Sequence, residues 1–372
     1  MLSDSYISLS DCSQIDGIRD FVKNPHNDEN KRGRMSTPLY HRSKGDLYDI
    51  KIVETDQDLD INTNIRSAHA VSVYLLGYAL KSIIDQDIDR FLNLYSINLE
   101  GEERFRYPWL LCSLYHDVFS DIENTEKGLR IIHTDFEGIL LDLNIEYDIY
   151  DRIYSPGDKE VSLPHTYEKD TIAKYFAQKV MNSYGPDHGI LSGYFLYDRL
   201  SKNFSKHKDK HRDETEWCES HLHWADYQAR VFRFVADAII AHNIWHDPHS
   251  NIDQLRANEK NDKHKLLSKE LNPLAFYLSL IDTIEPYKYF EQYSKENLKH
   301  VFTDININYQ NNIITISQSE KSYFDFKCWH CKKMSNMNMW LENVNAFYNQ
   351  NTDKIYICLR KNQAENPSIR AI

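Results

Sequence analysis

Glycine and proline are scarce in this sequence: its 372 residues include 11 glycines and 10 prolines, against 25 tyrosines. Few turn-forming and helix-breaking residues, together with abundant leucine, isoleucine and tyrosine, indicate a mostly helical body. The six cysteines are scattered along the chain. This distribution favours the reduced thiols of a cytoplasmic protein over the disulfide framework of a small secreted domain.

A basic surface track and a long apolar run are also missing. The formal net charge of −12 argues against the basic stripe that non-specific nucleic-acid binding requires. No apolar stretch has the length of a membrane span, and the polar start MLSDSYISLSDCSQ does not resemble a signal peptide. We therefore expect a cytoplasmic protein with no membrane partner, which acts on a compact substrate. The sequence leaves its oligomeric state open.

Composition divides the chain into three parts. Residues 1–60 are polar and irregular, which predicts an N-terminal extension. Residues 61–300 carry apolar residues at three- and four-residue spacing, which predicts a domain of long helices. Residues 301–372 have a mixed pattern that predicts a small α+β appendage. The predicted fold class is therefore mainly α, with a small C-terminal α+β subdomain.

The helical spacing locates the individual elements. Helices are predicted over residues 65–86, 105–119, 171–185, 186–204, 224–245 and 273–290. Pro286 should kink or end the last of these. In the appendage, Asn311-Asn312 predicts the turn of a hairpin over 304–318. The remaining patterns predict a strand over 322–330, a helix over 337–350 and a strand over 354–361.

Metal-binding residue types lie in or beside the apolar helical segments. A His-Asp pair alone is weak evidence, because about one is expected by chance and His246-Asp247 is a second. Side chains from several helices carry more weight, because a helical bundle builds an internal metal site in this way. Mixed imidazole and carboxylate ligands suit Zn, Mn, Fe, Ni or Co better than Ca. The candidate metal ligands are His69, His116, Asp117, His188, His242 and Asp282.

The order of these residues resembles the HD superfamily of metal-dependent phosphohydrolases, over roughly residues 61–290. The family pattern is His, then His-Asp, then a distal Asp, and members with two metals add two histidines before the distal Asp. Within this stretch, "DHG" and "AI-x-AHN" are similar to the HD nucleases of CRISPR systems and to other bacterial conflict-system hydrolases. The resemblance implies an HD-domain helical bundle. The matching residues are His69, His116-Asp117, His188, His242 and Asp282.

The resemblance also implies a cofactor and a division of roles. Two divalent metal ions are expected, of Mn, Fe, Ni, Co, Zn or Mg, with Asp117 as the bridge and Asp117 and His116 as the catalytic pair. His69, His116 and Asp282 would complete the shell of one ion, and His188 and His242 would hold the second. Many members continue the pair as HDxGK or HDxxE. Here Val118 and Phe119 follow instead, so the general acid stays open.

Cationic and imidazole groups near the ligands are candidate substrate contacts. Arg66 lies one turn before His69, and Lys288 follows Asp282 by six residues, after the Pro286 break. His246 would share a helix face with His242 if that helix continues, as an additional ligand or a substrate contact. Cys328 and Cys331 form half of a zinc-site spacing without a second such pair. They are expected to be reduced thiols, with metal binding left open.

The leading functional prediction is a phosphodiesterase that acts on a nucleotide or cyclic nucleotide through a dinuclear metal site and metal-activated water. Its partner would be a small phosphorylated or nucleotide substrate. An HD-type single-strand nuclease is one alternative, and it would need a continuous positive groove that leads to the metals. A non-catalytic metal- or nucleotide-binding regulatory module is the other, and the missing Gly-Lys after the His-Asp pair keeps it open.

Overall fold

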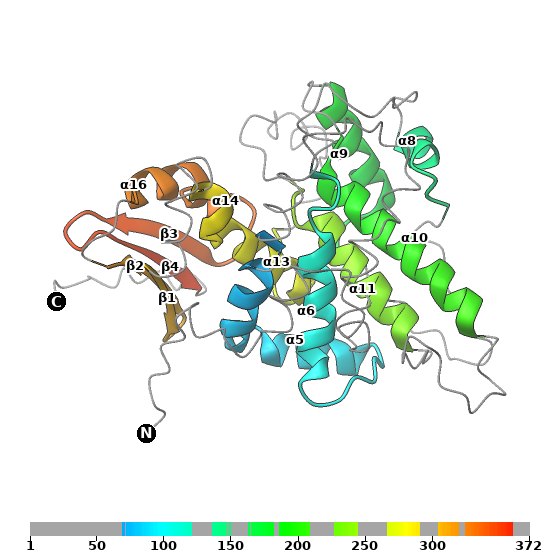
Figure 1. Ribbon diagram of the computed structural model, residues 1–372, viewed down its shortest axis with the longest axis horizontal. Coiled ribbons are helices and arrows are strands. Elements are labelled where there is room, and N and C mark those ends of the chain that lie inside the picture. The colour runs from blue at the N-terminus through cyan, green and yellow to red at the C-terminus, as the bar shows by residue number, and fades with distance from the viewer. Residues whose placement is uncertain are drawn as a thin grey trace, which may run out of the picture.

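The molecule has a helical body with a small antiparallel sheet at one end (Figure 1). This arrangement agrees with the predicted mainly helical class and its mixed C-terminal part. The predicted N-terminal extension lies outside the described residues. The computed structural model describes residues 69–70, 72–120, 136–146, 149, 163, 165–181, 186–208, 227–244, 266–290, 304–319 and 324–359.

The predicted helical segments are mainly helical where the structure describes them, although some of their ends differ. The helix predicted over 65–86 is interrupted, because Leu80 and Ile84 lie in turns on either side of a short 3₁₀ helix. Residues 69–70 and 72–79 form the first helix. The later elements of the body are η3 (Lys81–Ile83), α5 (Asp85–Leu94), α6 (Glu103–Tyr115), α8 (Phe136–Asp142), α9 (Lys169–Met181), α10 (His188–Lys208), α11 (Tyr227–Ala241), α13 (Pro273–Ile284) and α14 (Pro286–Phe290). No described helix combines the length and the apolar character that crossing a membrane requires.

The predicted helix over 105–119 ends early, at Tyr115. The amide of Val118 donates to the carbonyl of Tyr115 and that of Ser120 to the carbonyl of Asp117, so the chain leaves the α-helical pattern there. The Ser120 hydroxyl also donates to the Asp117 carbonyl at 2.9 Å. Asp117 therefore stands in a tight turn beyond α6 and not on the helix itself.

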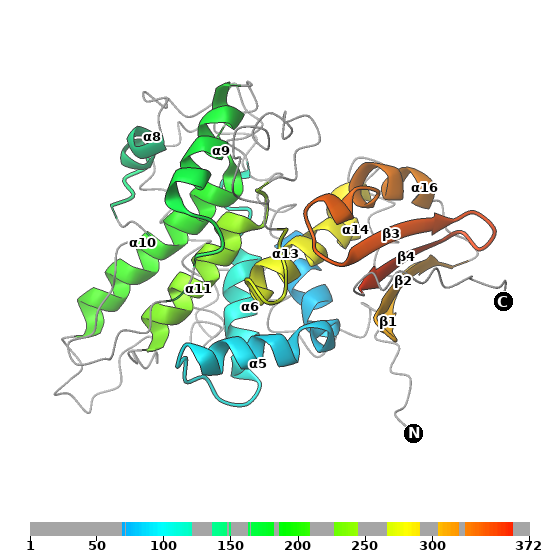
Figure 2. The ribbon, with the colours of Figure 1, turned by 180° about the vertical axis from the view of Figure 1, so that it is seen from behind.

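Helices α10 and α11 run side by side through the body (Figures 1 and 2). Gly193 permits their close approach. A Cβ atom added there would lie 2.5 Å from Cγ1 of Ile240 and 2.7 Å from the carbonyl oxygen of Ala236. The pairing brings the first residue of α10, His188, beside His242, which directly follows α11, with ring centroids 5.9 Å apart.

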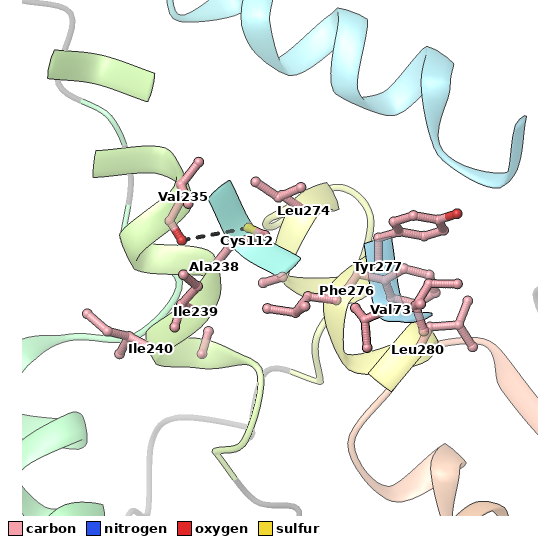
Figure 3. Close-up of a cluster of buried hydrophobic side chains, with 14 of the residues drawn as sticks. Val73, Cys112, Val235, Ala238, Ile239, Ile240, Leu274, Phe276, Tyr277 and Leu280 are labelled. Carbon is pink, nitrogen blue, oxygen red and sulfur yellow. Dashed lines mark hydrogen bonds between the residues drawn. The ribbon is translucent and has the colours of Figure 1, made fainter. Parts of the chain in front are cut away.

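A buried apolar cluster holds α6, α11 and α13 together (Figure 3). Cys112 of α6 lies between Val235 of α11 and Leu274 of α13, and all three side chains are fully buried. Burial raises the pKa of the Cys112 thiol well above its usual range, so the thiol packs as a small protonated apolar group. This cluster fixes three of the helices that carry candidate ligands.

A polar network also joins α11 to the start of α13. The Asn272 side chain accepts a hydrogen bond from the amide of Ala275, which caps α13, while its Nδ2 donates to Asp237 of α11 at 2.8 Å. Thr166 donates to the same Asp237 carboxylate through its hydroxyl and its amide. At its other end α13 stops at Ile284, before Pro286, as predicted.

The C-terminal sheet has the strand order β1-β2-β4-β3, and every neighbouring pair is antiparallel. The predicted hairpin is confirmed: Asn311 and Asn312 have φ values of 53° and 61°, which a primed turn requires. The strand predicted over 354–361 is confirmed as β4. The strands are β1 (Ile305–Gln310), β2 (Ile313–Gln318), β3 (Val344–Asn349) and β4 (Lys354–Leu359).

The strand predicted over 322–330 is wrong in its described part. Residues Phe326–Trp329 form the short helix α16, and His330–Met334 continue as a π-helical turn. The side chain of Asp325 accepts a hydrogen bond from the amide of Cys328 at 2.8 Å and caps this helix. Local capping thus prevails over the alternating aromatic pattern that suggested a strand.

The helix predicted over 337–350 is also wrong. Only Met337–Met339 are helical, as a 3₁₀ turn, and Val344–Asn349 form β3. The amide of Leu267 donates to the carbonyl of Trp340, and the amide of Glu342 donates to the carbonyl of Leu267, both at 2.9 Å. Pairing with a distant segment and with β4 therefore overrides the local helical spacing.

Candidate metal centre

The predicted metal ligands come together at the ends of helices, in the interior of the helical body. His116 and His242 directly follow α6 and α11, whereas His188 begins α10. Asp282 lies in the last turn of α13. A cation would benefit from this arrangement, because three helices turn their C-terminal ends, with partial negative charge, toward it. The six side chains that gather here are His69, His116, Asp117, His188, His242 and Asp282.

The first group of ligands surrounds Nε2 of His69. This atom lies 3.3 Å from Nε2 of His116 and 3.4 Å from Oδ2 of Asp117. Oδ1 of Asp282 lies 3.0 Å from Nε2 of His69 and 3.5 Å from Nε2 of His116. Two imidazole nitrogens and two carboxylates thus converge on one point, a donor set that suits a divalent transition metal.

The second group shares Asp117 with the first. Oδ1 of Asp117 lies 3.0 Å from Nε2 of His188. Asp117, His188 and His242 can offer three ligand atoms that all lie within 4.8 Å of one another, as can His69, His116 and Asp117. Oδ1 of Asp117 also lies 3.7 Å from Nε2 of His116. This single carboxylate therefore contacts histidines of both groups.

Hydrogen bonds orient two of the imidazole rings for metal binding. Nδ1 of His116 lies 3.0 Å from the carbonyl oxygen of Ser113, and Nδ1 of His242 lies 2.6 Å from that of Ile239. A carbonyl oxygen only accepts, so each Nδ1–H donates and each Nε2 keeps its lone pair. Nε2 of His242 is buried and has no hydrogen-bond partner within the described part of the chain. Such an atom fits a metal ligand, since a buried polar atom without a partner is costly.

The electrostatics keep His242 in the form that binds metals. Burial, assisted by the neighbouring His116, lowers the pKa of His242 to about 4. The ring is therefore neutral near pH 7, and no proton competes with a metal for its lone pair.

The centre is nearly closed to solvent. His116 and His242 are completely buried, and the Asp117 side chain is only 4% exposed. The most exposed ligands are Asp282, with 15% of its side chain accessible, and His188, with 10%. Access among the described residues is therefore from the side where Asp282 and His188 lie.

The start of α10 is held by a buried ion pair next to His188. Oδ1 of Asp187 accepts a hydrogen bond from the amide of Ile190 and caps the helix, while Oδ2 accepts one from Nζ of Lys179 at 2.7 Å. Burial alone would raise the pKa of Asp187, but Lys179, His188 and these hydrogen bonds hold it below its usual range. Asp187 thus stays ionised and fixes the helix end that carries His188.

One acidic residue that touches the centre was not predicted from the sequence. Oε2 of Glu285 lies 2.8 Å from Nδ1 of His69, on the opposite side of the ring from the candidate ligands. The sequence offered only its position, three residues after Asp282 and directly before Pro286.

The predicted substrate contacts lie outside what the structure describes. Arg66 and His246 fall outside the described residues, and Lys288 lies in α14 with its side chain outside them. Their roles as substrate contacts stay predictions. Cys328 and Cys331 are free thiols, and they belong to neither of the ligand groups found in the described residues.

Comparisons with known proteins give no match for this chain, either to a family model, to a curated protein or to a solved structure. The buried histidines and aspartates are compatible with an HD-type motif, and this compatibility rests on their order and geometry alone.

Proposed function

We propose that this protein is a metal-dependent phosphohydrolase of the HD type, which cleaves a phosphodiester bond in a nucleotide or cyclic nucleotide. The observation that carries the proposal is the position of Asp117 between two groups of histidines, with its carboxylate in contact with both. Hydrolytic sites with two ions use such a shared carboxylate to hold the ions close together.

The residues fit a pair of divalent cations. His69, His116 and Asp282 would hold one ion together with Asp117. His188 and His242 would hold the other together with the same carboxylate. When bound, divalent ions lower the pKa of water and neutralise the negative charge of a phosphate group.

The chain itself orients the rings of the ligands and keeps bulk water away from them. The hydrogen bonds to Ser113 and Ile239 keep the rings of His116 and His242 in one tautomer. In the proposed reaction, water attacks phosphorus and one P–O ester bond breaks, giving a phosphate monoester and a hydroxyl group. The substrate would approach past Asp282 and His188, because the other ligands are more deeply buried.

The net charge of −12 favours a compact substrate that is bound through the ions themselves. A long nucleic acid would need a basic track as well. The two alternatives are the single-strand nuclease and the non-catalytic module, and one experiment distinguishes both from the phosphodiesterase.

That experiment combines metal analysis with a substrate screen. The purified protein is loaded with Mn²⁺, Ni²⁺ or Zn²⁺, and the bound metal is counted. Turnover is then measured on cyclic nucleotides, phosphomonoesters and single-stranded DNA, with Asp117→Asn as the matched inactive variant. We expect two ions per chain and turnover of a small phosphodiester. Cleavage of DNA alone would favour the nuclease, and metal binding without any turnover would favour the regulatory module.

A further inference from the structure

The imidazole of His69 lies between two carboxylates that come from one end of α13. Asp282 faces its Nε2 at 3.0 Å, and Glu285 faces its Nδ1 at 2.8 Å. Asp282 belongs to the candidate ligands, whereas Glu285 is on the far side of the ring and cannot reach the same ion. Glu285 therefore needs a different explanation.

Glu285 is held firmly and away from water. Its side chain has no exposed surface. Its Oε1 accepts hydrogen bonds from the hydroxyl of Ser72 at 2.5 Å and from the amide of Tyr287 at 2.8 Å. Its Oε2 faces His69. Both carboxylate oxygens thus accept hydrogen bonds, from a hydroxyl and an amide on one side and an imidazole on the other.

The backbone explains how Glu285 reaches this place. α13 ends at Ile284, and Glu285 adopts an extended conformation, with φ −68° and ψ 120°, as the residue before Pro286. The chain then starts α14, whose residue Tyr287 donates its amide back to the Glu285 side chain. Ser72 lies one turn after His69 on the first helix, so this helix contributes two of the three donors.

We infer that Glu285 is a positioning residue that fixes His69 as a metal ligand. Because its carboxylate accepts the Nδ1–H of His69, the lone pair of the ring is confined to Nε2, which faces His116, Asp117 and Asp282. An anionic acceptor on the far nitrogen also makes an imidazole a stronger ligand, and loss of such a partner typically weakens metal binding about 10- to 100-fold. The inference rests on the metal-binding part of the proposed function.

The test measures metal affinity and ring tautomer, and needs no substrate. Mn²⁺ is titrated into the full-length protein and into Glu285→Gln, Glu285→Ala and Ser72→Ala. The matched control is Thr283→Val, because Thr283 is buried in the same turn but its hydroxyl donates to the carbonyl of Ser279, away from His69. The tautomer of His69 is followed by NMR in metal-free protein with isotope-labelled histidine, using His69→Gln for assignment.

We expect Mn²⁺ affinity to fall about 10- to 100-fold in Glu285→Ala and less in Glu285→Gln, which retains one acceptor oxygen. Ser72→Ala should have a smaller effect, and Thr283→Val should match the parent. His69 should carry its proton on Nδ1 in the parent protein and lose that preference in Glu285→Ala.

Three outcomes would overturn the inference, and they can be told apart. An unchanged tautomer in Glu285→Ala would show that Glu285 does not orient the ring. Equal Mn²⁺ affinity in the parent and Glu285→Ala would reject the positioning role while leaving the proposed metal site intact. A parent protein that binds no divalent metal would reject both the inference and the proposed function.

Discussion

Asp117 and His188 face each other across the centre, with Oδ1 of the carboxylate 3.0 Å from Nε2 of the imidazole. The other oxygen of Asp117 is turned toward His69, at 3.4 Å. Asp117 is the carboxylate that belongs to both groups of candidate ligands. If two ions bind here, Asp117 is therefore the best-placed anion for both to share.

Asp117→Ala should therefore abolish phosphodiester hydrolysis and release at least one ion. The protein should stay folded, because the turn after α6 is held by hydrogen bonds to the backbone carbonyl of Asp117, which the substitution keeps. Bound metal, activity and the circular-dichroism melting curve would be measured together. His246→Ala, at an optional ligand position, should have a milder effect.

A matched control for this prediction is Asp89→Ala. Asp89 is half exposed and pairs with Arg104 on the surface, so its loss should change neither metal content nor activity. Full phosphodiesterase activity in Asp117→Ala would disprove the proposed mechanism even if the fold is correct.

Much of this centre could be predicted from the sequence, because its parts are local signals. Apolar spacing placed His69, His188 and His242 on or beside buried helices, and Pro286 marked the break after α13. The Asn311-Asn312 turn was equally local, since two successive positive φ values favour asparagine there.

The remainder depends on contacts between distant residues, which spacing does not encode. Glu285 acquires its role only because α13 packs beside the helix of His69, more than two hundred residues earlier. The segment 337–350 has a helical apolar pattern, but Leu267 pairs with the chain around Leu341 and β4 pairs with β3. In both cases the tertiary partner decides the outcome.

Gly189→Ala should weaken metal binding by displacing His242. A Cβ atom at position 189 would lie 2.8 Å from Cε1 and 3.1 Å from Nδ1 of that ring. The ring would have to move and strain its hydrogen bond to Ile239. We expect at least a tenfold loss of affinity for Mn²⁺, measured by titration, since reorienting a ligand typically costs about 10- to 100-fold.

Gly193→Ala provides the comparison one turn along α10. Its Cβ would meet Ile240 and the backbone of Ala236 and would not contact a candidate ligand. Both variants should lose about 1–3 kcal/mol of stability through overpacking. Only the change at Gly189 should reduce metal affinity strongly, and equal affinities in the two variants would contradict this explanation.

Asp237→Ala should destabilise the junction of α11 and α13. Without the carboxylate, the buried hydroxyl and amide of Thr166 and the side-chain Nδ2 of Asn272 lose an acceptor. We expect a loss of about 3 kcal/mol in the free energy of urea unfolding, as found when buried donors are left unpaired.

Asp237→Asn should cost less than Asp237→Ala. It retains an acceptor oxygen, and burial, opposed by the hydrogen bonds from Thr166 and Asn272, raises the pKa of Asp237, so the charge itself is unfavourable there. Glu137→Ala is the surface control, because the Glu137 side chain is 79% exposed. A loss in Asp237→Ala no larger than in this control would show that the network does not hold the two helices.

The metal-free protein should become less stable as the pH decreases from 6.5 toward 4, because of His242. Its pKa is about 4 in the folded protein and 6.5 in an ordinary environment, and burial is the main cause of the difference. Between these values the unfolded chain binds a proton that the folded protein excludes, so the free energy of unfolding decreases as the pH falls. The full contribution is present above pH 6.5 and corresponds to roughly 3 kcal/mol.

This prediction is tested with urea unfolding of metal-stripped protein at about pH 7 and about pH 4.5. Other groups also titrate in this range, so the informative quantity is the difference between the parent protein and His242→Gln. Glutamine does not titrate, and its amide can still donate to the carbonyl of Ile239. The parent should lose roughly 2–3 kcal/mol more than the variant between the two pH values. Equal losses of unfolding free energy in the two proteins would mean that burial does not hold His242 neutral. Burial would then not explain why the Nε2 lone pair of this ring is available to a metal.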